Sequence, residues 1–271
     1  MISRSRRLLI TVLPLTALPL ALVACGSGGD GSSTPDRTMP TAAATNLVDT
    51  CRPGESSDSS AFVEATRNAS AKAKTFHLAG TVTLPLGTSA ASGQMEGDAD
   101  VSDPTNPKMT VKITTAGQSV EVLFIDKAAF MQVPGGDTYL KYPLTDQELG
   151  AFTQLNAADS IEKTKNSMTD LRCVGTEDVN GTTTGHYRYQ TDPKALLGTG
   201  TGTESTTGIT GPPATVEVWV GSDNLPVKMV TDAAGAPSTF EYSRYGEPVS
   251  ITAPDPAKVQ TIPDAGSIGT S

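Results

Sequence analysis

The sequence lacks the residue patterns that most enzyme families require. It contains neither the G-x-S-x-G motif of serine hydrolases nor the H-E-x-x-H motif of zinc peptidases, and it has no phosphate-binding P-loop. Histidine is scarce: the two histidines, His77 and His186, are far apart, and each lies on the polar side of a predicted strand beside an aromatic residue. We therefore expect no catalytic activity, no metal site and no cofactor.

Positive charge is also in short supply. The chain has 20 Lys and Arg against 29 Asp and Glu, which gives a formal net charge of -9. Three of the arginines, Arg4, Arg6 and Arg7, precede the first hydrophobic run, so the rest of the chain carries -12. Such an acidic surface disfavours contact with polyanions and with anionic headgroups. The sequence thus argues against a nucleic-acid partner.

Only one long hydrophobic run is present, from Leu8 to Val23. It follows a basic segment, is interrupted by prolines and leads into the small residue Ala24, which is the pattern of a secretory signal peptide over residues 1–24. The run is short for a membrane span, which needs about 20 apolar residues. We expect this segment to direct export and to be removed.

The residues around Cys25 predict a lipid anchor. Leu22-Val23-Ala24-Cys25 resembles the lipobox of bacterial lipoproteins. In such proteins cleavage leaves the cysteine as the first residue, and its sulfur carries a diacylglyceryl group with fatty acyl chains such as palmitate. Two acyl chains suffice for stable attachment, whereas one gives marginal binding. We expect a protein held on the outer face of the cell membrane; the alternative is an ordinary secretory signal with an incidental cysteine.

Two cysteines remain, Cys51 and Cys173. In an oxidising exterior, a leftover pair most simply forms a disulfide, which would contribute roughly 2–4 kcal/mol by closing a long loop. The alternative is a redox-active or nucleophilic thiol. Neither cysteine lies in a C-x-x-C motif or has a histidine close in sequence, so we favour the disulfide.

The rest of the chain divides into a linker, one domain and a tail. Residues 25–57 are rich in Gly, Ser, Thr, Ala and Pro without an apolar period, which indicates a flexible linker with a reach of roughly 30 Å. Residues 58–254 form the predicted domain. Residues 255–271 are predicted to be a disordered tail.

Within the domain, the apolar period changes from helical to alternating. Residues 59–74 have helical spacing, and residues 143–168 indicate a helical insertion of one or two short helices. Between and after these helices, segments such as Met109–Ile113 alternate apolar and polar residues. We predict an α+β fold in which a curved antiparallel sheet, a half-barrel, packs on helices. Such a sheet can leave a hydrophobic cavity between the layers.

The domain resembles the LppX/LprG family of actinobacterial cell-envelope lipoproteins over about residues 62–254. This resemblance implies a half-open antiparallel barrel packed on helices, with a hydrophobic cavity. It also implies binding of acylated lipids or glycolipids and their movement across the envelope, without any catalytic residue to transfer. The insertion Gly198–Pro213 and the extra cysteines depart from the family pattern. The segments that carry the resemblance are Thr75–Gly80, Val174–Gly181, Thr184–Tyr187, Val216–Val220, Asn224–Met229 and Tyr242–Ile251.

Two functions follow from these observations. The first is a lipid-binding carrier whose partners are an acylated lipid or glycolipid, the membrane and an envelope transport protein. The second is a non-enzymatic sensor or scaffold that acts through its surface and has a filled core. In the first, apolar residues on one face of the predicted strands would line the cavity. These candidates are Leu78, Val82, Val111, Ile113, Val122, Phe124, Val218 and Val220.

Overall fold

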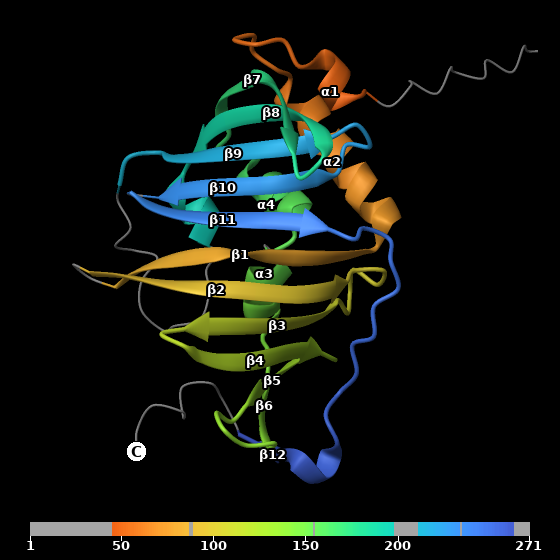
Figure 1. Cartoon of the computed structure of the whole chain (residues 1–271), viewed down its shortest axis with the longest axis vertical. Helices are drawn as coiled ribbons and strands as arrows, with labels where there is room; N and C mark the ends of the chain where they lie inside the picture. The colour runs from red at the N-terminus through yellow and green to blue at the C-terminus, as the bar shows by residue number, and fades with distance from the viewer. Residues whose placement is uncertain (1–44, 87–88, 154, 198–210, 234, 263–271) are drawn as a thin grey trace, which may run out of the picture. The chain divides into compact units, whose positions relative to one another are not determined.

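The computed structural model describes residues 45–86, 89–153, 155–197, 211–233 and 235–262 (Figure 1). The predicted signal peptide and Cys25 lie outside the described residues. The described residues belong to one compact unit, Ala43–Ser271, and the account below concerns that unit.

A single sheet of 12 strands forms the framework of the described residues. It consists of two antiparallel meanders that meet where β1 pairs with β11, and β12 pairs with β6 in parallel at one edge (Figure 1). The other edge is β7, and since the two edges do not pair, the curved sheet is not closed into a barrel. The strands are β1 (Thr75–Leu86), β2 (Ser89–Asp100), β3 (Lys108–Thr115), β4 (Gln118–Ile125), β5 (Ala128–Gln132), β6 (Tyr139–Pro143), β7 (Thr169–Val179), β8 (Thr182–Thr191), β9 (Ala214–Gly221), β10 (Pro226–Ala233), β11 (Ala236–Ser243) and β12 (Val259–Thr261).

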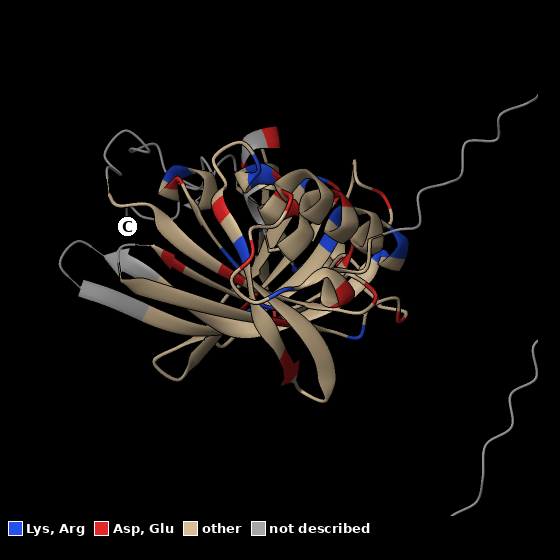
Figure 2. Cartoon of the chain, turned by 90° about the horizontal axis from the view of Figure 1, so that it is seen from above, with Lys and Arg blue, Asp and Glu red and all other residues tan. Residues whose placement is uncertain are grey.

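The helices gather on one side of the sheet (Figure 2). The longest, α2 (Ser59–Ala73), begins where the Asp58 side chain accepts a hydrogen bond from the Ala61 N–H, and it buries Phe62 and Val63. Together with Ile161 of α4 these side chains share one core with the sheet. The shorter helices are α1 (Leu47–Thr50), α3 (Asp146–Thr153), α4 (Ala157–Thr164) and α5 (Pro193–Leu197). We call the sheet face toward α2 and α4 the inner face.

Glycines on the inner face permit the sheet to coil. A Cβ atom at Gly80 would lie 2.1 Å from the carbonyl oxygen of Thr239, and one at Gly97 would lie 2.1 Å from that of Thr110. No side chain fits at such distances. Glycine at these positions therefore allows neighbouring backbones to approach where the strands bend.

The ordered structure extends beyond the predicted domain at both ends. Helix α1 lies in the segment assigned to the linker, and its Leu47 is buried. Strand β12 lies in the segment assigned to the tail, and its parallel pairing makes the sheet mixed rather than purely antiparallel. Both elements are too short for an apolar period to be recognised in the sequence. Contacts with residues distant in sequence hold them in place.

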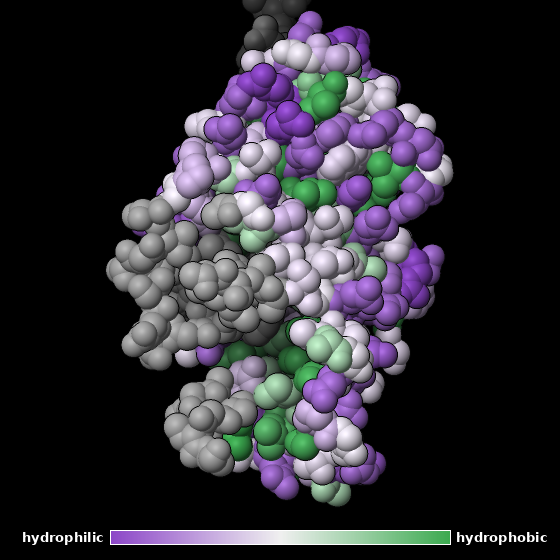
Figure 3. Space-filling view, turned by 60° about the vertical axis from the view of Figure 1, so that its left-hand side comes forward, coloured by the Kyte–Doolittle hydropathy of each residue, from purple (hydrophilic) through white to green (hydrophobic). Residues whose placement is uncertain are grey.

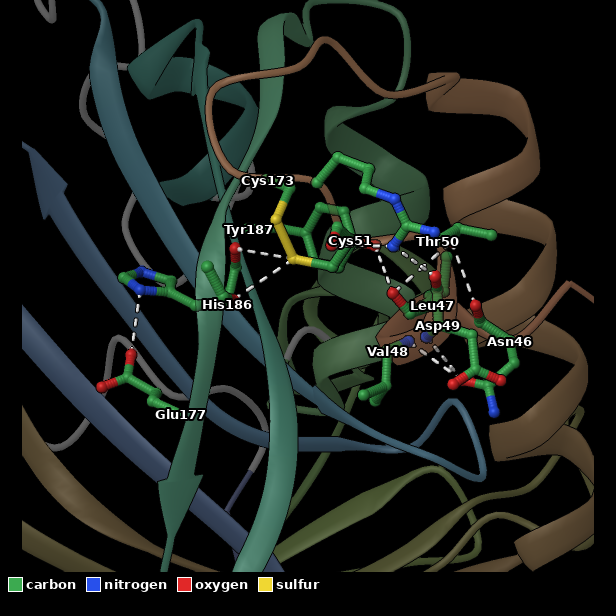
Figure 4. Close-up of a disulfide and its surroundings, with 12 residues drawn as sticks. Asn46, Leu47, Val48, Asp49, Thr50, Cys51, Cys173, Glu177, His186 and Tyr187 are labelled. Carbon is green, nitrogen blue, oxygen red and sulfur yellow. Dashed lines mark hydrogen bonds and ion pairs between the residues drawn. A yellow bond between two sulfur atoms is a disulfide. The ribbon is translucent and has the colours of Figure 1, made fainter. Parts of the chain in front are cut away.

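A disulfide joins Cys51 to Cys173 across 122 residues, with 5.3 Å between the Cα atoms. It connects the end of α1 to the edge strand β7 (Figure 4). The Tyr187 hydroxyl donates to the Leu47 carbonyl oxygen at 2.5 Å, and the Leu47 N–H donates to Asn224 Oδ1 at 2.9 Å. The disulfide predicted from the sequence is present, and it fixes the entry of the chain into the domain.

Candidate functional site

The strand register places all eight candidate cavity residues on the inner face. Leu78 lies opposite Gly97, Gly97 opposite Val111, and Val111 opposite Val122. Residues that lie directly opposite in neighbouring strands share a face, as do residues two apart in one strand. The same argument, taken through β11 and β10, puts Val218 on this face. Val82, Ile113, Phe124 and Val220 follow at even spacing.

The inner face is covered at one end of the strands and less covered at the other. In β3 the exposed fraction is 5% at Met109 and 2% at Val111 but 36% at Ile113. In β1, Leu78 is fully buried, whereas Val82 is half-buried. We call the less covered end, at the β1–β2 and β3–β4 turns, the open end.

Hydrophobic side chains continue to the open end. Figure 3 brings this end of the strands forward and shows a hollow whose visible walls are hydrophobic. Half-buried apolar side chains pack beside the core, from the sheet and from the segments around α3 and α4. They are Met95, Val122, Tyr142, Leu144, Leu155 and Phe240.

The candidate residues therefore differ in their surroundings. Five of them are part of the core packed between sheet and helices: Leu78, Val111, Phe124, Val218 and Val220. Val82 and Val122 are half-buried, and Ile113 is exposed at the open end. The open-end residues are those that a ligand could reach without displacing a helix.

One polar group on the inner face was not identified from the sequence. The Tyr242 hydroxyl is buried and has no hydrogen-bond partner among the described residues. By contrast, the Tyr189 hydroxyl lies 3.1 Å from Thr164 Oγ1, and the Tyr187 hydroxyl donates to a backbone carbonyl. Burial raises the pKa of Tyr242 above its ordinary value, so this hydroxyl stays protonated. Alternation in β11 indicates that Tyr242 faces inward, but it gives no sign that the hydroxyl is unpaired.

The two histidines lie on the opposite, outer face. His186 stacks on Trp219 with ring centroids 4.1 Å apart, and its Nδ1 is 3.0 Å from Glu177 Oε1 (Figure 4). Burial lowers the pKa of His186, against the opposing effect of Glu217 and Glu177. His77 Nδ1 is 2.9 Å from Asp98 Oδ1. These contacts give both histidines packing and hydrogen-bonding roles within the sheet.

Within the described part of the chain, no group of three or more His, Cys, Asp or Glu residues is arranged to hold a metal ion. The same residues contain no helix with the length and hydrophobicity needed to cross a membrane. Charged residues occur on both the strands and the helices (Figure 2), and in β3 the register places Lys112 opposite Glu96 and Glu121 on the outer face.

No protein-family model matches the sequence, and no curated protein sequence matches it. Solved structures do match. LprF from Mycobacterium bovis is similar with a TM-score of 0.54 at 13% identity, covering 72% of this chain and 96% of that one. LppX from Mycobacterium tuberculosis gives a TM-score of 0.49 at 17% identity, with 72% and 100% covered. A LolA superfamily protein from Nitrosomonas europaea gives 0.32 at 12% identity, with 73% and 99% covered.

At these identities the likeness concerns the fold. The chain shares the curved, open sheet and helices of LprF. The curved, open sheet packed on helices that the LppX/LprG resemblance implied is therefore confirmed, with one parallel pair at its edge, and the implied cavity stays a prediction.

Proposed function

We propose that this chain is an exported, membrane-anchored lipoprotein without catalytic activity. It binds an acylated lipid or glycolipid in a hydrophobic cavity between the inner face and the helices, and it helps move that lipid through the cell envelope. The observation that carries this proposal is the loss of cover along the inner face, from the buried Val111 to the exposed Ile113.

An acyl chain suits the open end because both are apolar. Contiguous apolar surface exposed to water marks an interaction site in most soluble proteins. Burying one methylene group is worth about 0.8 kcal/mol, so about eight methylenes laid on this surface would gain roughly 6 kcal/mol before ordering costs. On the outer face, positions such as Lys112, Glu96 and Glu121 carry charged side chains. The apolar cluster of Leu123, Ile125 and Phe130 on that face is covered by Ile251 and Val259.

The anchor would keep the domain near its source of cargo. Lipid on Cys25 would hold the protein on the outer face of the membrane, and the described structure begins at Thr45. A linker of about 20 residues has a reach of roughly 25 Å. The domain would then collect lipid from the membrane and deliver it to an envelope transport protein.

A second function remains open: a non-enzymatic sensor or scaffold that acts through its surface. The burial of Leu78, Val111 and Phe124 favours it, because these side chains already fill part of the space between the layers. Under this function the core is closed, and apolar ligands do not enter.

A matched pair of substitutions in β3 separates the two functions. Ile113 faces the open end, whereas its neighbour Lys112 points to the outer face, where it lies opposite Glu96 and Glu121. We predict that the mature chain, made with Cys25→Ser so that it carries no lipid of its own, takes up a fluorescent acyl probe. Ile113→Trp should weaken uptake about tenfold or more by filling the hollow, and Lys112→Trp should leave it unchanged.

Native mass spectrometry of the same preparations provides the second measurement. Bound lipid should be present on the wild-type chain and on Lys112→Trp, and depleted on Ile113→Trp. A wild-type chain that carries no lipid and takes up no probe would exclude the carrier function and leave the surface function.

A further inference from the structure

We propose that the cargo is an acyl lipid with an oxygen function along its chain, such as a hydroxyl or keto group, and that the Tyr242 hydroxyl recognises it. This inference rests on the proposed function, and it specifies the class of lipid. The structural basis is an unpaired polar group in an otherwise apolar site.

Tyr242 differs from the other buried tyrosines. Its side chain is 4% exposed, and its hydroxyl has no hydrogen-bond partner among the described residues. The hydroxyls of Tyr187, Tyr189 and Tyr245 are each paired with a carbonyl or hydroxyl oxygen. A buried hydroxyl left without a partner is unfavourable, and native proteins keep few such groups. A partner that arrives with the ligand would account for this one.

The position of Tyr242 suits the interior of an acyl chain. It lies opposite Leu78 in the sheet, four residues along β1 from Val82 at the open end. That distance is about 13 Å at the rise of a strand. A lipid that enters tail first therefore places its chain, rather than its headgroup, beside this hydroxyl.

The inner face between the open end and Tyr242 includes positions without side chains. Gly93 lies opposite Val82, and Gly80 lies opposite both Met95 and Phe240. These glycines place no side chain of their own above the sheet, and the neighbouring strands approach them closely. We infer that an extended chain passes over them beside the half-buried Met95 and Phe240 to reach Tyr242.

The ring of Tyr242 packs against an aromatic neighbour, and its unpaired hydroxyl is the group that can distinguish one lipid from another. Its ring packs edge-on against Phe76, with centroids 6.0 Å apart. The hydroxyl remains protonated because of its burial, so it can donate to a hydroxyl or keto oxygen. A saturated chain offers no acceptor and leaves the donor unpaired. Sites built around a buried hydrogen-bonding group reject analogues that lack the matching atom.

Competition between two fatty acids tests this inference. Stearic acid and a mid-chain hydroxystearic acid would displace a fluorescent acyl probe from the full mature chain. We expect the wild-type chain to prefer the hydroxy acid about tenfold, which corresponds to one charge-neutral hydrogen bond. Tyr242→Phe should lose this preference while binding stearic acid at least as well. Tyr189→Phe, which removes a hydroxyl paired with Thr164, should keep the preference.

Infrared spectra of a bound mid-chain ketostearic acid give an independent measurement on the wild-type chain alone. A ketone that accepts a hydrogen bond should absorb at lower frequency than the same ketone in hydrocarbon. An unshifted ketone band, equal affinities in the wild type, or a preference that survives Tyr242→Phe would overturn the inference while leaving lipid binding intact. If neither acid nor probe binds the wild-type chain, the proposed function fails, and the inference fails with it.

Discussion

At the residue scale, the close approach of neighbouring strands on the inner face depends on glycines, which have no side chain. Gly97 lies between Leu78 and Val111 in the same row of the sheet, and a Cβ atom there would overlap the Thr110 carbonyl oxygen. Gly175 in β7 also occupies a strand, but no atom lies within 4 Å of the position that its Cβ would take. The two glycines thus differ in what a methyl group would meet.

We predict that Gly97→Ala destabilises the domain by about 1–3 kcal/mol, because the strands must separate to admit the methyl group. Gly175→Ala should change the free energy of unfolding by less than about 1 kcal/mol. Urea unfolding of the mature chain measures both. Equal effects of the two substitutions would show that the close strand approach at Gly97 does not limit stability.

At this scale the sequence predicted the orientation of side chains better than it predicted their burial. Alternation in the strands was enough to place Leu78, Val111 and Val218 on a common face. Alternation also placed His186 on the polar face, but it gave no sign that the ring would be buried against Trp219. Burial on an outer face depends on cross-strand neighbours, which a single strand's sequence does not contain.

At the element scale, α1 and the segment after it act as an extension of the sheet. The Gly54 N–H donates to the Cys173 carbonyl oxygen, and the Cys173 N–H donates to the Glu55 carbonyl oxygen. These bonds cover part of the exposed edge of β7, which limits pairing with other chains. The disulfide makes that cover permanent.

We predict that replacing both cysteines, Cys51→Ala with Cys173→Ala, lowers the free energy of unfolding by about 5 kcal/mol. A loop of this length gains close to that amount in the unfolded-chain entropy model. Urea unfolding measures the loss. As a control, Arg52→Ala, next to the disulfide but exposed, should have little effect. A double variant as stable as the wild type would mean that α1 docking alone holds the segment.

A second segment, which runs from Ile251 to β12, covers part of the outer face of β4 and β5. Leu123, Ile125 and Phe130 form a small apolar cluster there, and Ile251 and Val259 pack against it. Lys258 Nζ lies 2.9 Å from Asp137 Oδ2 beside β12. This segment explains why apolar residues are tolerated on an outer face that is otherwise polar.

At the scale of the whole molecule, the proposed attachment and the proposed cargo binding involve different parts of the chain. The anchor proposed at Cys25 lies outside the described residues, and the inner face lies within the domain. Each part can therefore be tested without disturbing the other.

We predict that Cys25→Ala moves the protein from the membrane fraction to the medium or the soluble envelope fraction, because no lipid then holds it. Ser27→Ala, two residues along the linker, should leave it membrane-bound. Fractionation of cells that express each variant measures the difference. If Cys25→Ala stays with the membrane after a high-salt wash, the attachment has another source.

The sequence by itself determined the features that depend on neighbouring residues. Those that the structure describes are the helix from Ser59 and the orientation of alternating strand residues. The export segment and the cysteine that follows it stay predictions. Hydrophobic run length, helical spacing and alternation are local, so they can be recognised without a fold. With Cys25 assigned to the predicted lipid anchor, Cys173 was the one cysteine left to pair with Cys51.

Only the tertiary structure decided which of those residues are covered. The pairing of β1 with β11, the docking of α1 and the addition of β12 join residues far apart in sequence. The exposure of Ile113 and the unpaired hydroxyl of Tyr242 depend on what the helices and neighbouring strands place above them. Burial and hydrogen-bond pairing are properties of the surroundings, and the fold alone assembles those surroundings.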